Sequence, residues 1–140
     1  MANLRTDNLY GVSGPDTNGS ALFDGSNHLV AANATAFRVN QGSSEDFTIE
    51  AWIYLTATPD GANARIASIY HTSGNQRSYM FYVHTDDTLK FNYASNGTAG
   101  SVSTLAGGTV PHNQWVHVAV THDASATAVR LFKNGVLKAT

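Results

Sequence analysis

The stretch WVHVAVTHDASATAVRLFKNGVLKAT, residues 115–140, decides the fold class of this chain. Its first part alternates, so that Val116, Val118 and Val120 share one face of an extended strand. A loop leads to a second apolar strand at 128–133, and an Asn-Gly pair then turns the chain into a third strand. Short strands joined by tight turns predict antiparallel β-structure.

The Asn-Gly pair at 134–135 also predicts how the last two strands pair. In a two-residue loop this pair favours a type I′ turn, because both positions need positive φ. We therefore expect Lys133 to face Val136 and Phe132 to face Leu137. Two strands alone are marginally stable in water, so the hairpin should dock on the preceding valine-rich strand.

A second alternating stretch, DFTIEAWIYLT at 46–56, has one face that is apolar throughout. That face carries Phe47, Ile49, Ala51, Ile53 and Leu55, and the opposite face carries Thr48, Glu50, Trp52 and Tyr54. Burying the apolar face leaves the opposite face outside the core. We expect the first face, together with the valines of 116–120, to form the core.

Turn residues divide the rest of the chain into further short segments. We expect a short strand and turn at 21–25 followed by the apolar HLVA, and strands at 64–71, 77–84, 88–94 and 101–105. Residues 1–20 are polar and are expected to form an N-terminal arm, with one domain over 21–140. About eight or nine strands at this spacing predict a β-sandwich or jelly roll.

Composition excludes several classes of protein. The chain has 140 residues, 42% hydrophobic and 13% charged, with a formal net charge of -2 and no cysteine. Without a basic run, non-specific nucleic-acid binding is not expected. No apolar stretch reaches the length of a membrane span, and the first residues lack the apolar centre of a signal peptide.

Four motifs together resemble a known family. ALFDGSNHLV, FTIEAWIYL, NQWVHVAVTHD and VRLFKNGVLKAT resemble, in order and spacing, the laminin-G-like jelly rolls of the concanavalin A-like lectin/glucanase superfamily. The resemblance covers about residues 20–140 and implies an all-β, antiparallel jelly-roll sandwich.

The superfamily pattern continues after the Asn-Gly hairpin with more strands, including one similar to G-x-I-D-E-V-R-I-Y. Nothing in this chain matches that strand. We therefore expect a sandwich that is incomplete at its C-terminus. The favoured interpretation is a piece of a longer chain; completion by strands of a neighbouring subunit and a minimal variant are the alternatives.

The N-terminal MANLRTDNLYG resembles the start of virion structural proteins of marine tailed phages. This resemblance implies a non-enzymatic fibre, appendage or capsid-decorating protein located in the virion. Its partners would be other virion subunits or copies of itself, and host-surface glycans. The alternatives are a carbohydrate-binding or adhesion module of a larger secreted bacterial protein, at the cell surface, and a truncated glucanase.

Glycoside hydrolysis is not expected from these residues. It needs two carboxylates about 5–10 Å apart across the scissile bond. Glucanases of the superfamily place them on one strand as E-x-D-x-x-E, whereas Glu50 in TIEAW has no acidic partner two residues away. We expect Glu50 to be a sheet-face residue paired with Arg or Thr. Alternation places His117 and His122 on opposite faces, which argues against a shared metal site. The family resemblance implies a packing role for His117.

Aromatic side chains are the candidate ligand contacts, because their flat faces can stack on sugars. The candidates are Trp52, Tyr54, Tyr70, Tyr79, Tyr82 and Tyr93. Trp52 and Tyr54 are the strongest carbohydrate-binding candidates, since they lie opposite the all-apolar face of their strand. The alternative for these aromatic residues is packing, in the core or on an outer sheet face. The family resemblance favours packing for Trp52, because the matching motif carries a Trp at this position.

Calcium is the one cofactor that the loops suggest; otherwise no cofactor is expected. Asp24, Asp86 and Asp87 are candidate metal ligands, since Ca²⁺ prefers oxygen donors. Each is also an ordinary turn residue, and the chain has no dense acidic loop of the D-x-D-x-D kind.

Overall fold

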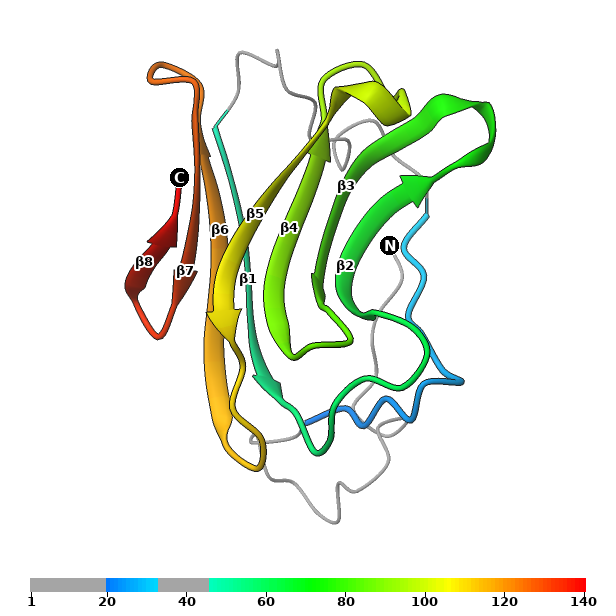
Figure 1. Cartoon of the computed structure of the whole chain (residues 1–140), viewed down its shortest axis with the longest axis vertical. Helices are drawn as coiled ribbons and strands as arrows, with labels where there is room; N and C mark the ends of the chain where they lie inside the picture. Colours follow the sequence, from blue (N-terminus) through cyan, green and yellow to red (C-terminus); the bar gives the residue numbers. More distant parts are fainter. Residues whose placement is uncertain (1–19, 33–45) are drawn as a thin grey trace. The chain divides into compact units, whose positions relative to one another are not determined.

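The computed structural model describes residues 20–32 and 46–140 (Figure 1). Within these residues the fold consists of strands with two single turns of 3-10 helix, Ser73–Asn75 and Ala99–Ser101. The strands are β1 (Phe47–Tyr54), β2 (Ala64–His71), β3 (Gln76–Val83), β4 (Thr88–Ala94), β5 (Val102–Thr109), β6 (Trp115–Asp123), β7 (Ala128–Lys133) and β8 (Val136–Ala139). No helix in this part of the chain is long and apolar enough to cross a membrane.

The eight strands form two antiparallel sheets of four. The first sheet has the order β1-β6-β7-β8 and the second the order β2-β3-β4-β5. Figure 1 shows the sheets as two layers, and β5 of the second sheet lies against β7 and β8 of the first. The prediction of an all-β sandwich is confirmed, and its architecture is consistent with a jelly roll.

The core lies between the two sheets. Its largest fully buried side chains are Phe81, Leu89 and Phe91 of the second sheet and Val116, Val118, Val120 and Leu131 of the first. The predicted inner face of β6 is therefore confirmed. The inner residues of β1 also pack on this core, but they are only partly buried, because β1 is the edge strand of its sheet among the described residues.

The predicted C-terminal hairpin is present in the expected register. Phe132 pairs with Leu137 and Lys133 with Val136. Both turn residues have positive φ, 50° at Asn134 and 74° at Gly135, as the type I′ prediction requires. As expected, the hairpin docks on the valine-rich strand, since β7 pairs along β6.

Residues 20–32 form no strand, so the prediction of a strand at 21–25 is wrong. The expected turn is present, with Gly25 at φ 89°. A strand needs a partner for its backbone hydrogen bonds, and among the described residues this segment has none. Its apolar side chains, which include Leu22 and Phe23, are exposed. Residues 1–19 of the predicted arm lie outside the described part of the chain.

Candidate binding site

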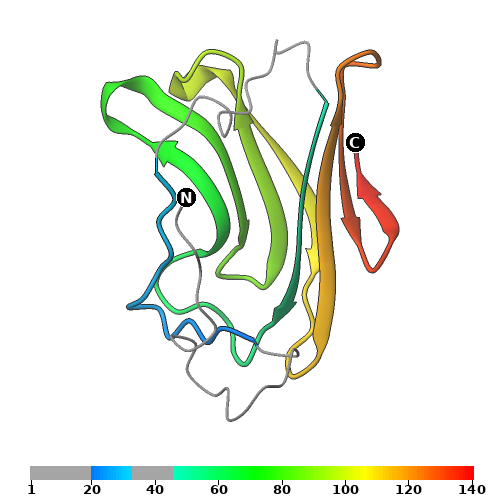
Figure 2. The ribbon, with the colours of Figure 1, turned by 180° about the vertical axis from the view of Figure 1, so that it is seen from behind.

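The outer face of β1 and β6 carries a cluster of exposed rings, which we call the aromatic platform: Trp52, Tyr54, Trp115 and His117. Figure 2 shows β1 beside β6, and the backbone register places Trp52 opposite His117 and Tyr54 opposite Trp115. Because side chains alternate along a strand, all four point away from the core that the same strands cover on their inner face.

Three rings of the platform are open to solvent. Trp52 is 65% exposed, Tyr54 44% and Trp115 50%. Solvent-exposed aromatic residues of this size, side by side on one sheet face, are typical of interaction sites rather than of packing. Neither indole N–H donates a hydrogen bond to another described residue. The rings thus offer both stacking faces and hydrogen-bond donors to a ligand.

Cross-strand contacts hold the rings in place. The Trp52 and His117 ring centres are 5.2 Å apart at 52°, and those of Tyr54 and Trp115 are 5.5 Å apart at 63°. Tilted and edge-to-face arrangements of this kind are the favoured ones for aromatic pairs. The platform is therefore two cross-strand pairs, each containing an exposed tryptophan.

Glu50 borders the platform and contacts His117, with Oε2 3.3 Å from Nε2. The expectation that Glu50 pairs with Arg or Thr is wrong. In the β1–β6 register Glu50 lies opposite Ala119, one same-face position from the Trp52–His117 pair, so the imidazole is its nearest polar neighbour. The Glu50 side chain is 64% exposed and remains accessible to a ligand.

The Asn-Gly turn also supports the platform. Asn134 Oδ1 accepts a hydrogen bond from the His117 backbone N–H at 2.9 Å. The Asn134 backbone N–H donates to the His117 carbonyl at 2.8 Å. The residue that sets the hairpin turn therefore also fixes the backbone of a platform residue.

The structure joins both predicted carbohydrate-binding residues to two that were not predicted to bind. Alternation in the sequence already places Trp115 and His117 on the face of their strand opposite the valines. They lie beside Trp52 only because β1 pairs with β6, and these two strands are distant in sequence. The signal in the sequence was the presence of tryptophans on the polar faces of both strands.

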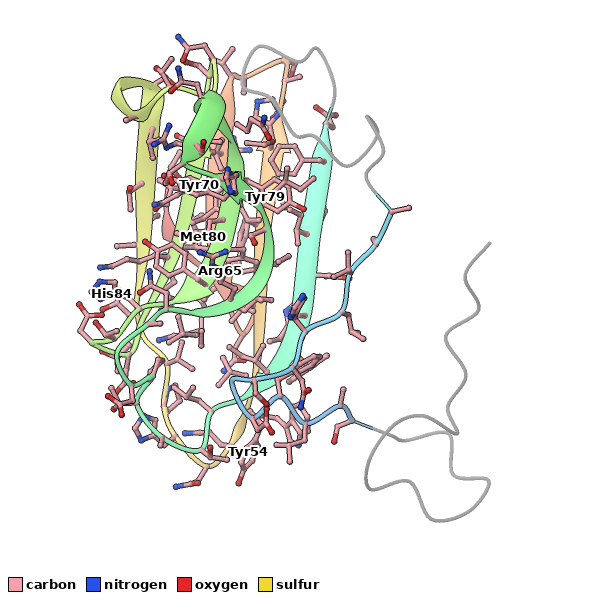
Figure 3. All side chains as sticks on the ribbon, turned by 90° about the vertical axis from the view of Figure 1, so that its right-hand side faces the viewer. Tyr54, Arg65, Tyr70, Tyr79, Met80 and His84 are labelled. Atoms are coloured by element: carbon pink, nitrogen blue, oxygen red, sulfur yellow. The ribbon has the colours of Figure 1, made fainter. Side chains whose placement is uncertain are left out.

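The other aromatic candidates lie elsewhere. Tyr79 and Tyr93 pack against the core, and Tyr82 is buried at 4% exposure. The Tyr82 hydroxyl donates to Asn92 Oδ1 at 3.2 Å, and burial raises the pKa of this phenol. Figure 3 shows Tyr70 on the second sheet, well apart from Tyr54.

The candidate calcium ligands are engaged by protein donors. Asp24 Oδ1 accepts bonds from Ser26 N–H, Ser26 Oγ and Asn27 Nδ2, an ordinary turn arrangement. Asp87 Oδ2 accepts from Thr58 Oγ1 at 3.0 Å and lies 3.1 Å from His112 Nε2.

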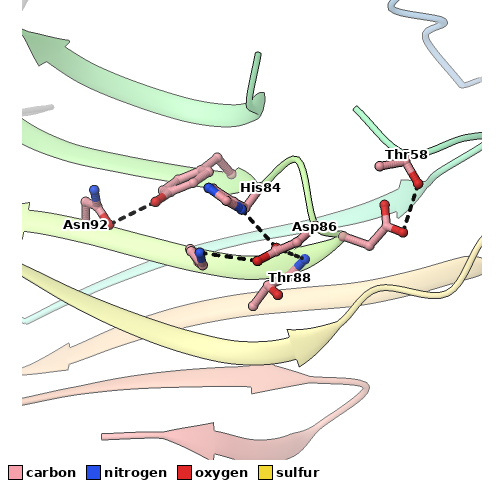
Figure 4. A network of polar contacts seen from close by, with 8 residues as sticks. Thr58, His84, Asp86, Thr88 and Asn92 are labelled. Atoms are coloured by element: carbon pink, nitrogen blue, oxygen red, sulfur yellow. Dashed lines mark hydrogen bonds and ion pairs between the residues drawn. The ribbon is translucent and has the colours of Figure 1, made fainter. Parts of the chain in front are cut away.

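The carboxylate of Asp86 contacts His84 and Thr88 (Figure 4). Asp86 Oδ1 accepts from the Thr88 N–H at 2.9 Å and lies 2.9 Å from His84 Nδ1, and Oδ2 is 3.8 Å from Lys90 Nζ. Hydrogen bonding by Thr88, together with His84, holds the pKa of Asp86 well below its usual range.

Within residues 20–32 and 46–140, no three His, Cys, Asp or Glu side chains are grouped so as to hold a metal ion. The residues therefore offer isolated carboxylates rather than a ligand set. Calcium binding stays a prediction.

Comparison with protein families now identifies the fold. Residues 23–140 match the model of the concanavalin A-like lectin/glucanases superfamily. The chain belongs to this superfamily. No curated protein and no solved structure matched the chain. The superfamily includes both sugar-binding lectins and sugar-cleaving glucanases, so the match leaves binding and hydrolysis to be decided by the residues of the site.

Proposed function

We propose that this domain is a non-enzymatic carbohydrate-binding module, and that the aromatic platform holds the sugar. The observation that carries the proposal is the pair of half-exposed tryptophans, Trp52 and Trp115, on adjacent strands of one sheet face. A sugar ring presents a C–H face to an aromatic ring and hydroxyls to nearby polar groups. The platform offers partners for both, through its rings and indole N–H groups.

The arrangement of acidic residues argues against hydrolysis. The platform rows, residues 50–54 of β1 and 115–119 of β6, contain one carboxylate, Glu50. Glycoside hydrolysis uses an acid and a second carboxylate across the scissile bond. Glu50 faces His117 instead of a second acid. Binding without cleavage is therefore the better match to this site.

The setting that we propose is a virion, in which the domain is a displayed structural subunit that contacts host-surface glycans. An extracellular bacterial module is the alternative setting. The support for a subunit role is the edge strand β1, whose inner residues Phe47, Ile49 and Ile53 are only partly buried. A strand of another copy or another virion subunit that paired along this edge would complete their burial.

Glycan binding by the full chain tests the module. A glycan array followed by calorimetry should give a ligand, and Trp52→Ala or Trp115→Ala should weaken it about tenfold or more, the usual effect of removing a binding hot spot. Leu137→Ala is the matched control, because Leu137 lies on the same sheet and is 50% exposed, like Trp115. Absence of any glycan ligand for the folded protein would contradict the proposal.

A further inference from the structure

We infer that the platform is specific for glycans that carry free amino groups, such as β-1,4-linked glucosamine. This inference rests on the proposed carbohydrate-binding function and adds the charge of the ligand. It follows from the combination of exposed indoles and one exposed carboxylate at the site.

The charge balance around the platform favours a cation. Glu50 is 64% exposed, and among the described residues its carboxylate contacts the His117 imidazole and no Lys or Arg. In the described part of the chain, the nearest cation on the same face by register is Arg130 of β7, which lies opposite Thr121 of β6 and pairs with Asp123 at 3.5 Å. An anionic sugar would therefore meet Glu50 without a cation to balance it, whereas an ammonium group would be attracted.

The rings favour the same ligand. Ammonium groups are attracted to the faces of aromatic rings, and tryptophan is the strongest such partner. Glu50 and Trp52 are same-face neighbours on β1, so their side chains start about 7 Å apart. A sugar stacked on Trp52 can thus place an ammonium substituent between the indole and the carboxylate. The His117 contact holds the Glu50 carboxylate at this side of the platform.

A neutral glycan would use only part of this arrangement. Hydroxyl or acetamido groups can stack and hydrogen-bond with the indoles but gain nothing from the charge of Glu50. The platform should therefore bind neutral glycans more weakly, without rejecting them. The contribution expected from one exposed ion pair and one cation–π contact corresponds to a preference of about fivefold.

Three hexasaccharides test the inference. They share a β-1,4-glucose backbone and differ only in the group on carbon 2, which is hydroxyl, acetamido or ammonium. Calorimetry with the full chain, at a pH where the amine is protonated, should show the ammonium hexamer binding about fivefold tighter than the hydroxyl hexamer. The preference should fall at high salt. It should nearly disappear in Glu50→Gln.

Asp60→Asn is the charge-matched control, because it removes one negative charge from an exposed loop residue outside the two platform strands. It should keep the preference. If all three hexamers bind equally and Trp52→Ala weakens them all, the ammonium specificity is wrong and the carbohydrate-binding module stands. If the preference survives in Glu50→Gln, the specificity is also wrong. If none of the hexamers binds the folded protein, both proposals fail.

Discussion

The outer faces of the two sheets differ in how far their large side chains are exposed. On the first sheet Trp52 and Trp115 are 65% and 50% exposed. On the second sheet, Met80 and Tyr82 alternate with the core residues of β3, yet they are 7% and 4% exposed. An aromatic residue on an outer sheet face is thus not by itself evidence of a binding site, and exposure separates the two cases.

The surroundings of Tyr82 account for part of this difference. Arg65 and Lys90 lie opposite it on the two neighbouring strands, and its ring centre is 6.4 Å from that of His84. Long side chains such as these can cover an aromatic ring with their aliphatic parts. The hydroxyl is satisfied by Asn92, so the residue contributes packing and a hydrogen bond. Among the described residues, no long charged side chain covers the exposed tryptophans of the first sheet in this way.

The largest effect on stability should come from truncating Tyr82, the buried aromatic residue of the second sheet. Tyr82→Ala should destabilise the protein by about 3–5 kcal/mol, as for other buried aromatic residues. Tyr82→Phe is the control: it loses only the bond to Asn92, which is worth about 1 kcal/mol. Urea denaturation measures both. A Tyr82→Ala protein as stable as the wild type would show that this outer face is not packed.

Val118→Ala tests whether β6 stabilises the protein mainly through its inner face. Val118 is fully buried on the inner face of β6, so its truncation should cost roughly 1–3 kcal/mol from lost burial and a small cavity. Thr121→Ala, on the outer face of the same strand, should change stability by less than about 0.5 kcal/mol. Similar losses for both variants would contradict the one-sided burial of β6.

Asp86 allows a smaller test at the rim of the second sheet, and its sign follows from its pKa. The folded state lowers the pKa of Asp86, so the ionised carboxylate stabilises the protein at neutral pH. This stabilisation is lost as the pH falls through the folded-state pKa. Asp86→Asn should therefore be less stable than wild type at neutral pH, and the two urea midpoints should converge in acid. A constant difference at all pH values would contradict the role of its charge.

Local patterns predicted most of the fold. Alternation correctly predicted the inner faces of β1 and β6. The Asn-Gly pair correctly predicted the register of β7 and β8. The strand at 21–25 failed because apolar character predicts a strand only where a partner exists, and pairing is not local. Only one strand of the candidate site was predicted, again because strand pairing is not local. The alternation within one strand is enough to predict Trp52 and Tyr54. Their contact surface with Trp115 depends on the pairing of β1 with β6.

Burial on the second outer face could not be predicted from alternation. The pattern in TLKFNYA places Lys90 and Asn92 outside, as observed, but says nothing of whether they cover Tyr82 on the neighbouring strand. Tyr82 and Tyr54 are both tyrosines in alternating strands. The cross-strand neighbours decide their exposure, and these neighbours depend on the register of three strands at once.

Only a small effect on stability should come from Trp52→Ala, the exposed counterpart of Tyr82→Ala. Trp52 contacts the His117 ring but is 65% exposed, so its removal should cost less than about 1 kcal/mol. The same variant should show the largest loss of glycan affinity, because it removes a stacking surface. Urea denaturation and calorimetry on one preparation separate the two quantities. If Trp52→Ala destabilised the protein as much as Tyr82→Ala, both outer faces would be packing surfaces, and the platform would not be a binding site.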